Sequence, residues 1–98
     1  MIIICGTIEV KEDGIEAYKK AAAVATEITL TEEGCGTYGF FQSLDKPTVF
    51  RVYEEWESKD NLRAHGAAEH FKAFGAAIKD IVVARKIQMI EPARIVDL

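Results

Sequence analysis

Two histidines and the only tryptophan of the chain lie close together in the sequence: Trp56, His65 and His70. Histidine is the side chain that most readily accepts a proton near neutral pH. Tryptophan offers a flat apolar surface and an indole N–H donor. Tyr38 and Tyr53 add hydroxyl groups that can hydrogen-bond a phenolic or carbonyl oxygen. These residue types suit a site that binds a small aromatic molecule and takes a proton from it.

Each of these side chains also has a structural interpretation. A histidine at a helix start is often a hydrogen-bonded structural residue, and a tryptophan in a small domain is often core. A metal site formed by the histidines with Glu69 is not favoured, because Glu69 and His70 are adjacent and point apart on a helix. The chain also lacks a glycine-rich turn between a strand and a helix. We therefore expect neither a metal nor a flavin or nicotinamide cofactor.

The composition is that of one small globular domain. The 98 residues suffice for a single hydrophobic core, so one domain spanning residues 1–98 is expected. The net charge is -4 and no basic cluster is present, which argues against nucleic acid as a partner. No apolar run is long enough for a bilayer, and the first residues do not have the pattern expected of a signal sequence. Cys5 and Cys35 lack metal-type spacing and are expected to be free thiols in a cytoplasmic protein.

Apolar periodicity predicts the order strand, helix, strand, strand, helix, strand. The expected strands cover residues 2–10, 35–44, 48–57 and 84–91. The first helix is expected to follow Asp13 as its N-cap, with Glu16 completing a capping box. This helix is expected to end near Glu33, where Gly34 can adopt a left-handed conformation. Its apolar face repeats at helical spacing: Ile15, Tyr18, Ala22, Ala25 and Thr29.

Ser58 is expected to cap a short helix that runs toward His65 and is interrupted by Gly66. A longer helix follows, with an apolar stripe at three- and four-residue steps. The residues of this stripe are Phe71, Phe74, Ile78, Ile81 and Val82.

This order predicts an α+β fold, a ferredoxin-like βαββαβ domain whose four-stranded antiparallel sheet carries its helices on one face. The third strand is expected to carry Phe50, Val52, Glu54 and Trp56 on one face and Val49, Arg51, Tyr53 and Glu55 on the other. Both faces carry large side chains and need a cover. The helices are expected to cover the Trp56 face. A second subunit is expected to cover the other, which predicts a homodimer through the open sheet face.

Glutamate, tryptophan and histidine recur with a specific spacing in the second half of the chain. An E-x-W motif ends at Trp56, an L-x-x-H motif ends at His65, and an H-F pair begins at His70. With this spacing the chain resembles the antibiotic biosynthesis monooxygenase (ABM) family. The resemblance implies a dimeric α/β barrel. It also implies a cofactor-independent monooxygenase that oxidises a small aromatic or quinol substrate in a cavity between sheet and helices.

The resemblance assigns expected roles to individual residues. Catalysis is expected of His65, His70 and Trp56. Substrate binding is expected of Tyr38, Tyr53, Glu55 and Phe71. Haem-degrading members of this fold use an asparagine and a histidine to bind haem iron, and this chain has Gly6 and about Gly75 at those places. Haem degradation is therefore not expected.

Two other functions remain open at this point. An isomerase of a small phosphorylated signal molecule, similar to autoinducer-2-processing enzymes, would need cations near the cavity. Lys59, Arg63 or Lys72 can supply them. A non-catalytic dimer would hold a small ligand without changing it, and its cavity would be too narrow for a ring or would open away from both histidines. An isomerisation assay without oxygen separates the isomerase from the monooxygenase.

Overall fold

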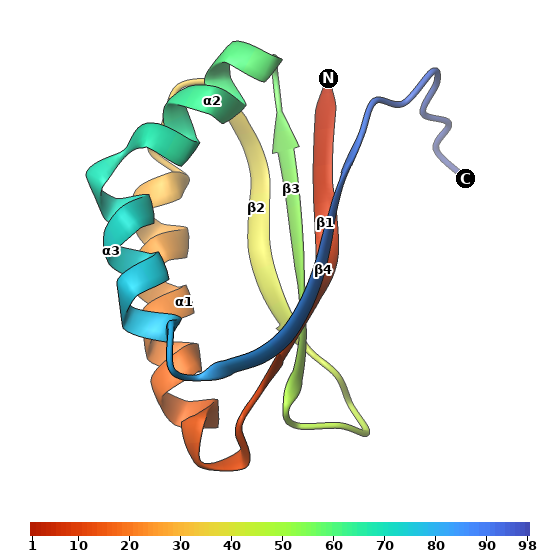
Figure 1. Cartoon of the computed structure of the whole chain (residues 1–98). Coiled ribbons are helices and arrows are strands. Elements are labelled where there is room, and N and C mark those ends of the chain that lie inside the picture. The colour runs from red at the N-terminus through yellow and green to blue at the C-terminus, as the bar shows by residue number, and fades with distance from the viewer.

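The computed structural model covers residues 1–98 and contains a four-stranded antiparallel sheet with its helices on one face (Figure 1). The strands are β1 (Ile2–Val10), β2 (Cys35–Gln42), β3 (Val49–Trp56) and β4 (Val82–Ile90). The helices are α1 (Ile15–Thr29), α2 (Lys59–Ala67) and α3 (Glu69–Ile78), and a short 3-10 helix, η1 (Glu12–Gly14), precedes α1. The strand order is β2-β3-β1-β4. The predicted ferredoxin-like βαββαβ fold is thereby confirmed.

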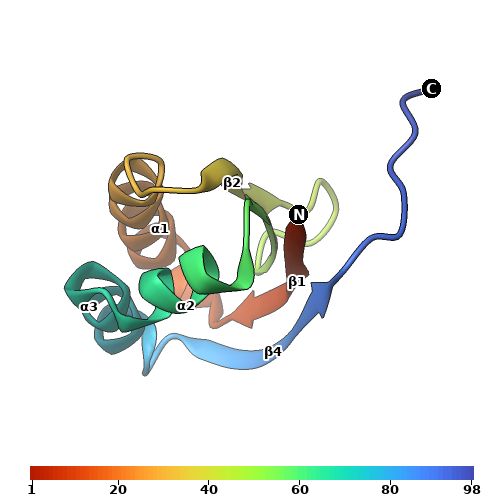
Figure 2. The same ribbon diagram turned by 90° about the horizontal axis from the view of Figure 1, so that it is seen from above.

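The centre of the sheet is β1, which pairs antiparallel with β3 on one side and with β4 on the other. The close approach of β4 depends on Gly6. A Cβ atom at this position would collide with the carbonyl oxygen of Lys86 and lie 2.6 Å from the Cα of Ile87. The sheet curves around the helices, as Figure 2 shows. The space under the helices is therefore bounded by β4 as well as by the central strands.

Helix α1 packs on the sheet through a face of small and aromatic side chains. The residues buried on this face are Tyr18, Ala22, Ala25 and Thr29, as their spacing predicts. The ring of Tyr18 lies 4.8 Å from that of Phe50 and 6.0 Å from that of Phe40, between centroids. The alanines let the helix approach the sheet, and the tyrosine fills the remaining space at the density typical of protein cores.

The alternation predicted for β3 is also confirmed. The side chains on its helix-facing side are all buried: Phe50, Val52, Glu54 and Trp56. Strand β2 continues the same layer, because Tyr38 pairs with Glu54 and Phe40 pairs with Val52. The opposite face of the sheet carries no helix (Figure 2).

The start and end of α1 differ from the predictions. Asp13 lies inside η1 and does not cap α1, whose N-cap is Gly14 and has no side-chain hydrogen bond. The helix ends at Thr29, before Glu33, because the chain turns there through short-range backbone hydrogen bonds. Gly34 has a φ of 79°, the left-handed conformation expected for it.

Helix α2 begins as predicted, with the side chain of Ser58 accepting a backbone N–H of the first turn. Gly66 does not interrupt the helix but lies inside it. A glycine in an exposed helix costs only about 1 kcal/mol relative to alanine, so it does not by itself end one. The break falls at Ala68, whose ψ of 146° is extended. Strand β4 begins at Val82, slightly earlier than the expected position 84.

The C-terminal segment after β4 extends away from the sheet (Figure 1; Figure 2). Its apolar side chains are exposed: Ile95, Val96 and Leu98. Among the helices, none combines the length and the apolar character that crossing a bilayer requires.

Candidate active site

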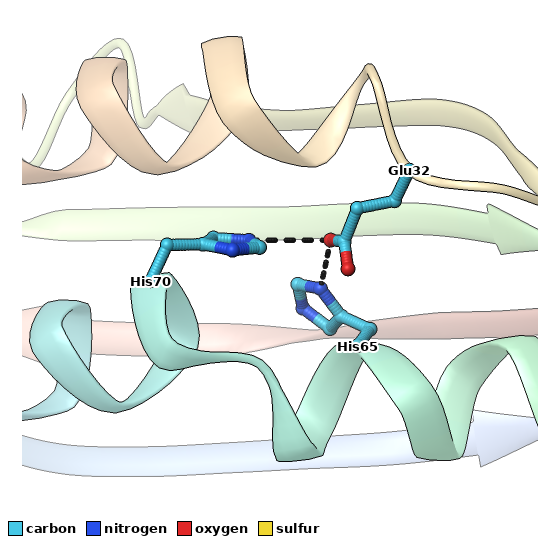
Figure 3. A group of neighbouring side chains, drawn as sticks. All are labelled: Glu32, His65 and His70. Atoms are coloured by element: carbon cyan, nitrogen blue, oxygen red, sulfur yellow. Dashed lines mark hydrogen bonds and ion pairs between the residues drawn. The ribbon is translucent and has the colours of Figure 1, made fainter.

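Glu32, in the turn after α1, binds two histidines from consecutive helices (Figure 3). The Nδ1–H of His65 on α2 donates to Oε1 of Glu32 across 2.6 Å. The Nε2 of His70 on α3 lies 3.2 Å from the same oxygen and 3.3 Å from the hydroxyl oxygen of Thr29. One carboxylate therefore joins the end of α1 to both α2 and α3.

Two backbone features bring this cluster together. The left-handed Gly34 redirects the chain after α1, and its missing side chain leaves room for Asn61 of α2, whose Cβ would lie 2.7 Å from an added Cβ. The extended Ala68 separates α2 from α3. Because of this break, His65 in the last turn of α2 and His70 in the first turn of α3 can face the same carboxylate.

The imidazole of His65 is enclosed by aromatic rings and is only 3% exposed. Its centroid lies 4.8 Å from that of Trp56, 5.0 Å from that of Phe71 and 5.7 Å from that of Tyr38. The Nε2 atom is buried and makes no hydrogen bond. In a neutral ring whose Nδ1 donates, this nitrogen is an acceptor.

Glu54 is a buried carboxyl on the helix-facing side of β3, 8% exposed. The indole N–H of Trp56 donates to its Oε1 across 2.8 Å. Burial raises the pKa of Glu54 above its ordinary value, and the Trp56 hydrogen bond and the nearby His65 oppose that rise. The dominance of burial is the behaviour of an acid that has lost most of its water.

A cavity of about 220 Å³ lies between the sheet and α3. Its walls are mostly apolar and aromatic, with one carboxylate and one guanidinium. The lining residues are Ile8, Tyr18, Tyr38, Phe40, Val52, Glu54, Phe71, Phe74, Gly75, Ile78, Val82, Arg85 and Ile87. A concave apolar site with a few polar groups is typical of small-molecule binding.

The two tyrosines in the cavity wall are neutral hydrogen-bond donors. Burial raises the pKa of Tyr18 to about 12. Burial also raises the pKa of Tyr38 well above its usual range, and the Glu54 carboxylate acts in the same direction. Both hydroxyl groups therefore keep their protons across the physiological range.

The structure divides the residues singled out from the sequence into four places. Tyr38 and Phe71 line the cavity. Trp56 and His65 contact each other directly behind that wall, and His70 lies beside Glu32, next to a separate apolar groove between α1 and α3. The two remaining candidates, Tyr53 and Glu55, alternate with the buried residues of β3 and thus lie on the open face, where the Tyr53 hydroxyl donates to Oε2 of Glu55 across 2.6 Å.

Sequence reasoning missed three charged residues of this region. The alternation of β3 places Glu54 on the helix-facing side among apolar residues, and a carboxyl there is the signal that could have found it. Arg85 faces the cavity through its pairing with Ile8, which depends on the irregular register of β4. Glu32 carries no sequence signal, because it meets His65 across 33 positions.

The Glu32, His65 and His70 side chains are also a donor set of the type that binds zinc or iron(II). One ligand atom from each lies within 4.8 Å of the others. Nδ1 of His65 is already hydrogen-bonded to Oε1 of Glu32, and Nε2 of His70 lies 3.2 Å from the same oxygen. A cation would have to replace these contacts, so the cluster fits a cross-link between helices better than a preformed metal site.

The fold and the site together define the class of this protein: a ferredoxin-like domain with an aromatic cavity under its helices. The model of the antibiotic biosynthesis monooxygenase family matches residues 1–77. The chain therefore belongs to that family. It is 26% identical over 84 residues to the candidate monooxygenase YcnE of Bacillus subtilis (strain 168), covering 86% of this chain and 88% of that protein.

A second relative is the candidate quinol monooxygenase YgiN of Escherichia coli (strain K12), 33% identical over 72 residues, or 64% of this chain and 68% of that protein. Among solved structures, a candidate antibiotic biosynthesis monooxygenase from Nitrosomonas europaea superposes with a TM-score of 0.90 at 26% identity, covering 96% and 100% of the two chains. A structure from Deinococcus radiodurans shares the fold, with a TM-score of 0.93 at 22% identity. The superposition covers 100% of this chain and 98% of that one.

Proposed function

We propose that this chain is a cofactor-independent monooxygenase that oxidises a small aromatic or quinol substrate in the cavity between the sheet and α3. The observation that carries this proposal is the cavity itself, which combines aromatic walls with a buried carboxylate. The names of its relatives, a monooxygenase and a quinol monooxygenase, support the same reaction class.

The reaction needs an electron-rich ring and a proton acceptor but no resident cofactor. A deprotonated phenol transfers electron density to dioxygen, and a carbon of the ring forms a bond to oxygen. The peroxide then takes up a proton and loses water, which leaves a quinone. One oxygen atom ends in the product and the other in water. The protein must hold the ring, exclude bulk water and manage the proton.

The residues around the cavity suit these tasks. Tyr38 and Phe71 present rings to a flat substrate. Trp56 and His65 support the wall from behind, because Trp56 binds Glu54 and His65 stacks on Trp56. His70 acts less directly, because it contacts the Glu32 carboxylate that orients His65. In this proposal Trp56, His65 and His70 position the site, and they do so without touching the substrate.

The functional unit in this proposal is a homodimer formed through the open sheet face. That face is uncovered and carries Arg51, Tyr53 and Glu55 beside the exposed ring of Phe41. Tyr53 and Glu55 then belong to the subunit interface. Sedimentation of the purified chain at micromolar concentration tests this assembly, and a stable monomer contradicts it.

The three cations expected to bind a phosphorylated substrate lie outside the cavity, whose wall contains a single cation, Arg85, together with the Glu54 carboxylate. Lys59 pairs with Glu91 and Arg63 pairs with Asp60, on exposed surfaces. Neither they nor Lys72 line the cavity. These positions favour the monooxygenase over the isomerase.

The cavity is tested by substituting glycines in α3 and α2. Gly75 lines the cavity, Gly66 does not, and an added Cβ meets nothing within 4 Å at either. Oxygen uptake is measured with a panel of quinols and naphthols. We expect turnover by the wild type, its loss in Gly75→Phe and its retention in Gly66→Phe. Mass spectrometry after labelling with heavy dioxygen should find one labelled atom in the product.

The contrary results are equally distinct. Binding of panel members without oxygen uptake would leave a non-catalytic binding protein. Equal turnover by the two glycine variants would move the reaction out of this cavity.

A further inference from the structure

We propose that Glu54 is the proton acceptor of the site and that the substrate is an aromatic compound with a free hydroxyl group donated to this carboxylate. The inference rests on the proposed function and deepens it by naming the catalytic residue and the substrate class.

Glu54 is the only carboxylate among the residues that line the cavity. Its Oε1 is held by the indole N–H of Trp56 at 2.8 Å. Its Oε2 makes no hydrogen bond within the protein. The only fully buried side-chain N or O atom without a partner is Nε2 of His65, so Oε2 of Glu54 keeps some accessible surface. A carboxylate with one oxygen anchored and the other facing a cavity is placed to receive a hydroxyl proton.

His65 is less well placed to react. Its ring does not line the cavity. The rings of Phe71 and Tyr38 do line it, and their centroids lie 5.0 Å and 5.7 Å from that of His65. Its Nδ1 is occupied by Glu32. A substrate in the cavity therefore meets the Glu54 carboxylate directly, whereas it meets the imidazole only if an aromatic side chain moves.

The surroundings of Glu54 give the carboxylate more basicity than an exposed one has. Tyr18 on α1, Tyr38 on β2 and Arg85 on β4 line the cavity with it, and His65 on α2, Glu32 and Cys35 lie close enough to affect its charge or be affected by it. The cavity-lining residues of α3 add no charge. Burial raises the pKa of Glu54, and its partners only partly reverse this. A stronger base takes a phenolic proton more readily.

The proton balance closes on this one residue. The substrate hydroxyl gives its proton to Glu54, and the resulting phenolate reacts with dioxygen to form a peroxide on the ring. Glu54 returns the proton to the peroxide and, as a carboxylate, takes the hydrogen of the oxygenated ring carbon as a proton. The electron pair of that C–H bond forms the new C=O while the O–O bond breaks, and the departing hydroxide takes the proton from Glu54 and leaves as water. The carboxylate is regenerated, and the quinone carries the second oxygen atom.

Arg85 defines the other end of the substrate. Glu54 on β3 pairs with Ile4 of the central strand β1, and Arg85 on β4 pairs with Ile8 of the same strand. The two charges therefore lie on opposite sides of β1 and at different heights along it. Arg85 makes no ion pair or hydrogen bond within the chain through its side chain and is free to bind an anionic or carbonyl oxygen. A ring with a hydroxyl at one end and a second oxygen at the other fits this arrangement.

The test compares Glu54→Gln with Glu16→Gln, which alters an exposed carboxylate on α1 outside the cavity. With a hydroxylated aromatic that the wild type turns over, kcat should fall about a hundredfold or more in Glu54→Gln and be retained in Glu16→Gln. In Trp56→Phe the rise of kcat/KM with pH should shift to higher pH, because the hydrogen bond that lowers the pKa of Glu54 is lost. An unshifted profile would contradict the assignment.

Binding is measured separately, by calorimetry under nitrogen, with a naphthol, its methyl ether and naphthalene. The wild type should bind the naphthol about tenfold tighter or more, and Glu54→Gln should lose that preference. Equal affinity of the wild type for all three overturns the inference, as does full turnover by Glu54→Gln. Absence of wild-type turnover with every panel member defeats the proposed function instead, and the binding comparison then decides whether Glu54 receives the hydroxyl.

Discussion

Trp56 donates its indole N–H to Glu54 across 2.8 Å, and both side chains are buried on the same face of β3. They are two positions apart in the strand, so the alternation of side chains sets them side by side. The ring of Trp56 also packs against that of His65, with 4.8 Å between centroids. The tryptophan therefore connects the cavity wall to the cluster that joins the helices.

Replacing Trp56 with phenylalanine keeps a ring against His65 but removes the donor to Glu54. We expect the free energy of unfolding to fall by about 1–3 kcal/mol, because a buried carboxylate oxygen loses its partner. Urea unfolding followed by circular dichroism measures this, since the variant has no tryptophan left for fluorescence. An unchanged stability would mean that the hydrogen bond does not persist in solution.

The buried carboxyl of Glu54 should make stability depend on pH in a defined direction. Because burial raises its pKa in the folded state, the native protein binds more protons than the unfolded chain above the ordinary value of 4.5. Stability from this group is fully present below that pH and is lost as pH rises through the raised pKa. Because a glutamine side chain does not titrate, Glu54→Gln should abolish this loss of stability at higher pH.

The measurement is urea unfolding of Glu54→Gln and wild type at a series of pH values. The stability of the variant relative to wild type should increase with pH across this window, with the exposed Glu16→Gln as control. A relative stability that decreases with pH would give Glu54 a lowered pKa and contradict the burial argument.

Glu32 should contribute to stability through both histidines. Glu32→Ala leaves the Nδ1–H of His65 buried without an acceptor and frees His70. We expect a loss of about 1–3 kcal/mol. The neighbouring Glu33 is exposed, so Glu33→Ala is the matched control and should have little effect. Similar losses in the two variants would show that the cross-link contributes nothing.

Two glycines should respond oppositely to alanine. At Gly6 an added Cβ collides with the backbone of β4, so Gly6→Ala should cost about 1–3 kcal/mol. At Gly75 an added Cβ meets nothing within 4 Å, and alanine is the better helix former, so Gly75→Ala should gain about 0.5–1 kcal/mol. Thermal unfolding of both variants tests the packing of β4 against β1. A neutral Gly6→Ala would mean that β4 lies farther from β1 than described.

Chelation should leave the protein folded. Oε1 of Glu32 accepts a hydrogen bond from His65 and lies 3.2 Å from Nε2 of His70, so the cluster does not need a cation to be stable. The expected result is an identical melting temperature before and after dialysis against a strong chelator. A marked fall would instead identify these residues as metal ligands.

Local chemistry accounts for much of the fold. Strand alternation sets Trp56 on the helix-facing side, helical spacing sets the buried face of α1 from Tyr18 to Thr29, and the hydroxyl of Ser58 starts α2. Each of these depends on residues within a few positions of one another. They are readable from the sequence because periodicity and capping are local properties. The order of the strands and helices is compatible with only a few sheet topologies, and the chain adopts the ferredoxin-like one.

The arrangement of the site was decided by tertiary structure alone. Nothing local indicates that Glu32 meets His65, or that the break between helices falls at Ala68 and not at Gly66. The sequence motif draws attention to the imidazole and the indole, but packing encloses both rings and leaves Glu54 facing the cavity. Contacts between distant segments depend on how whole elements pack, and only the folded chain specifies that packing.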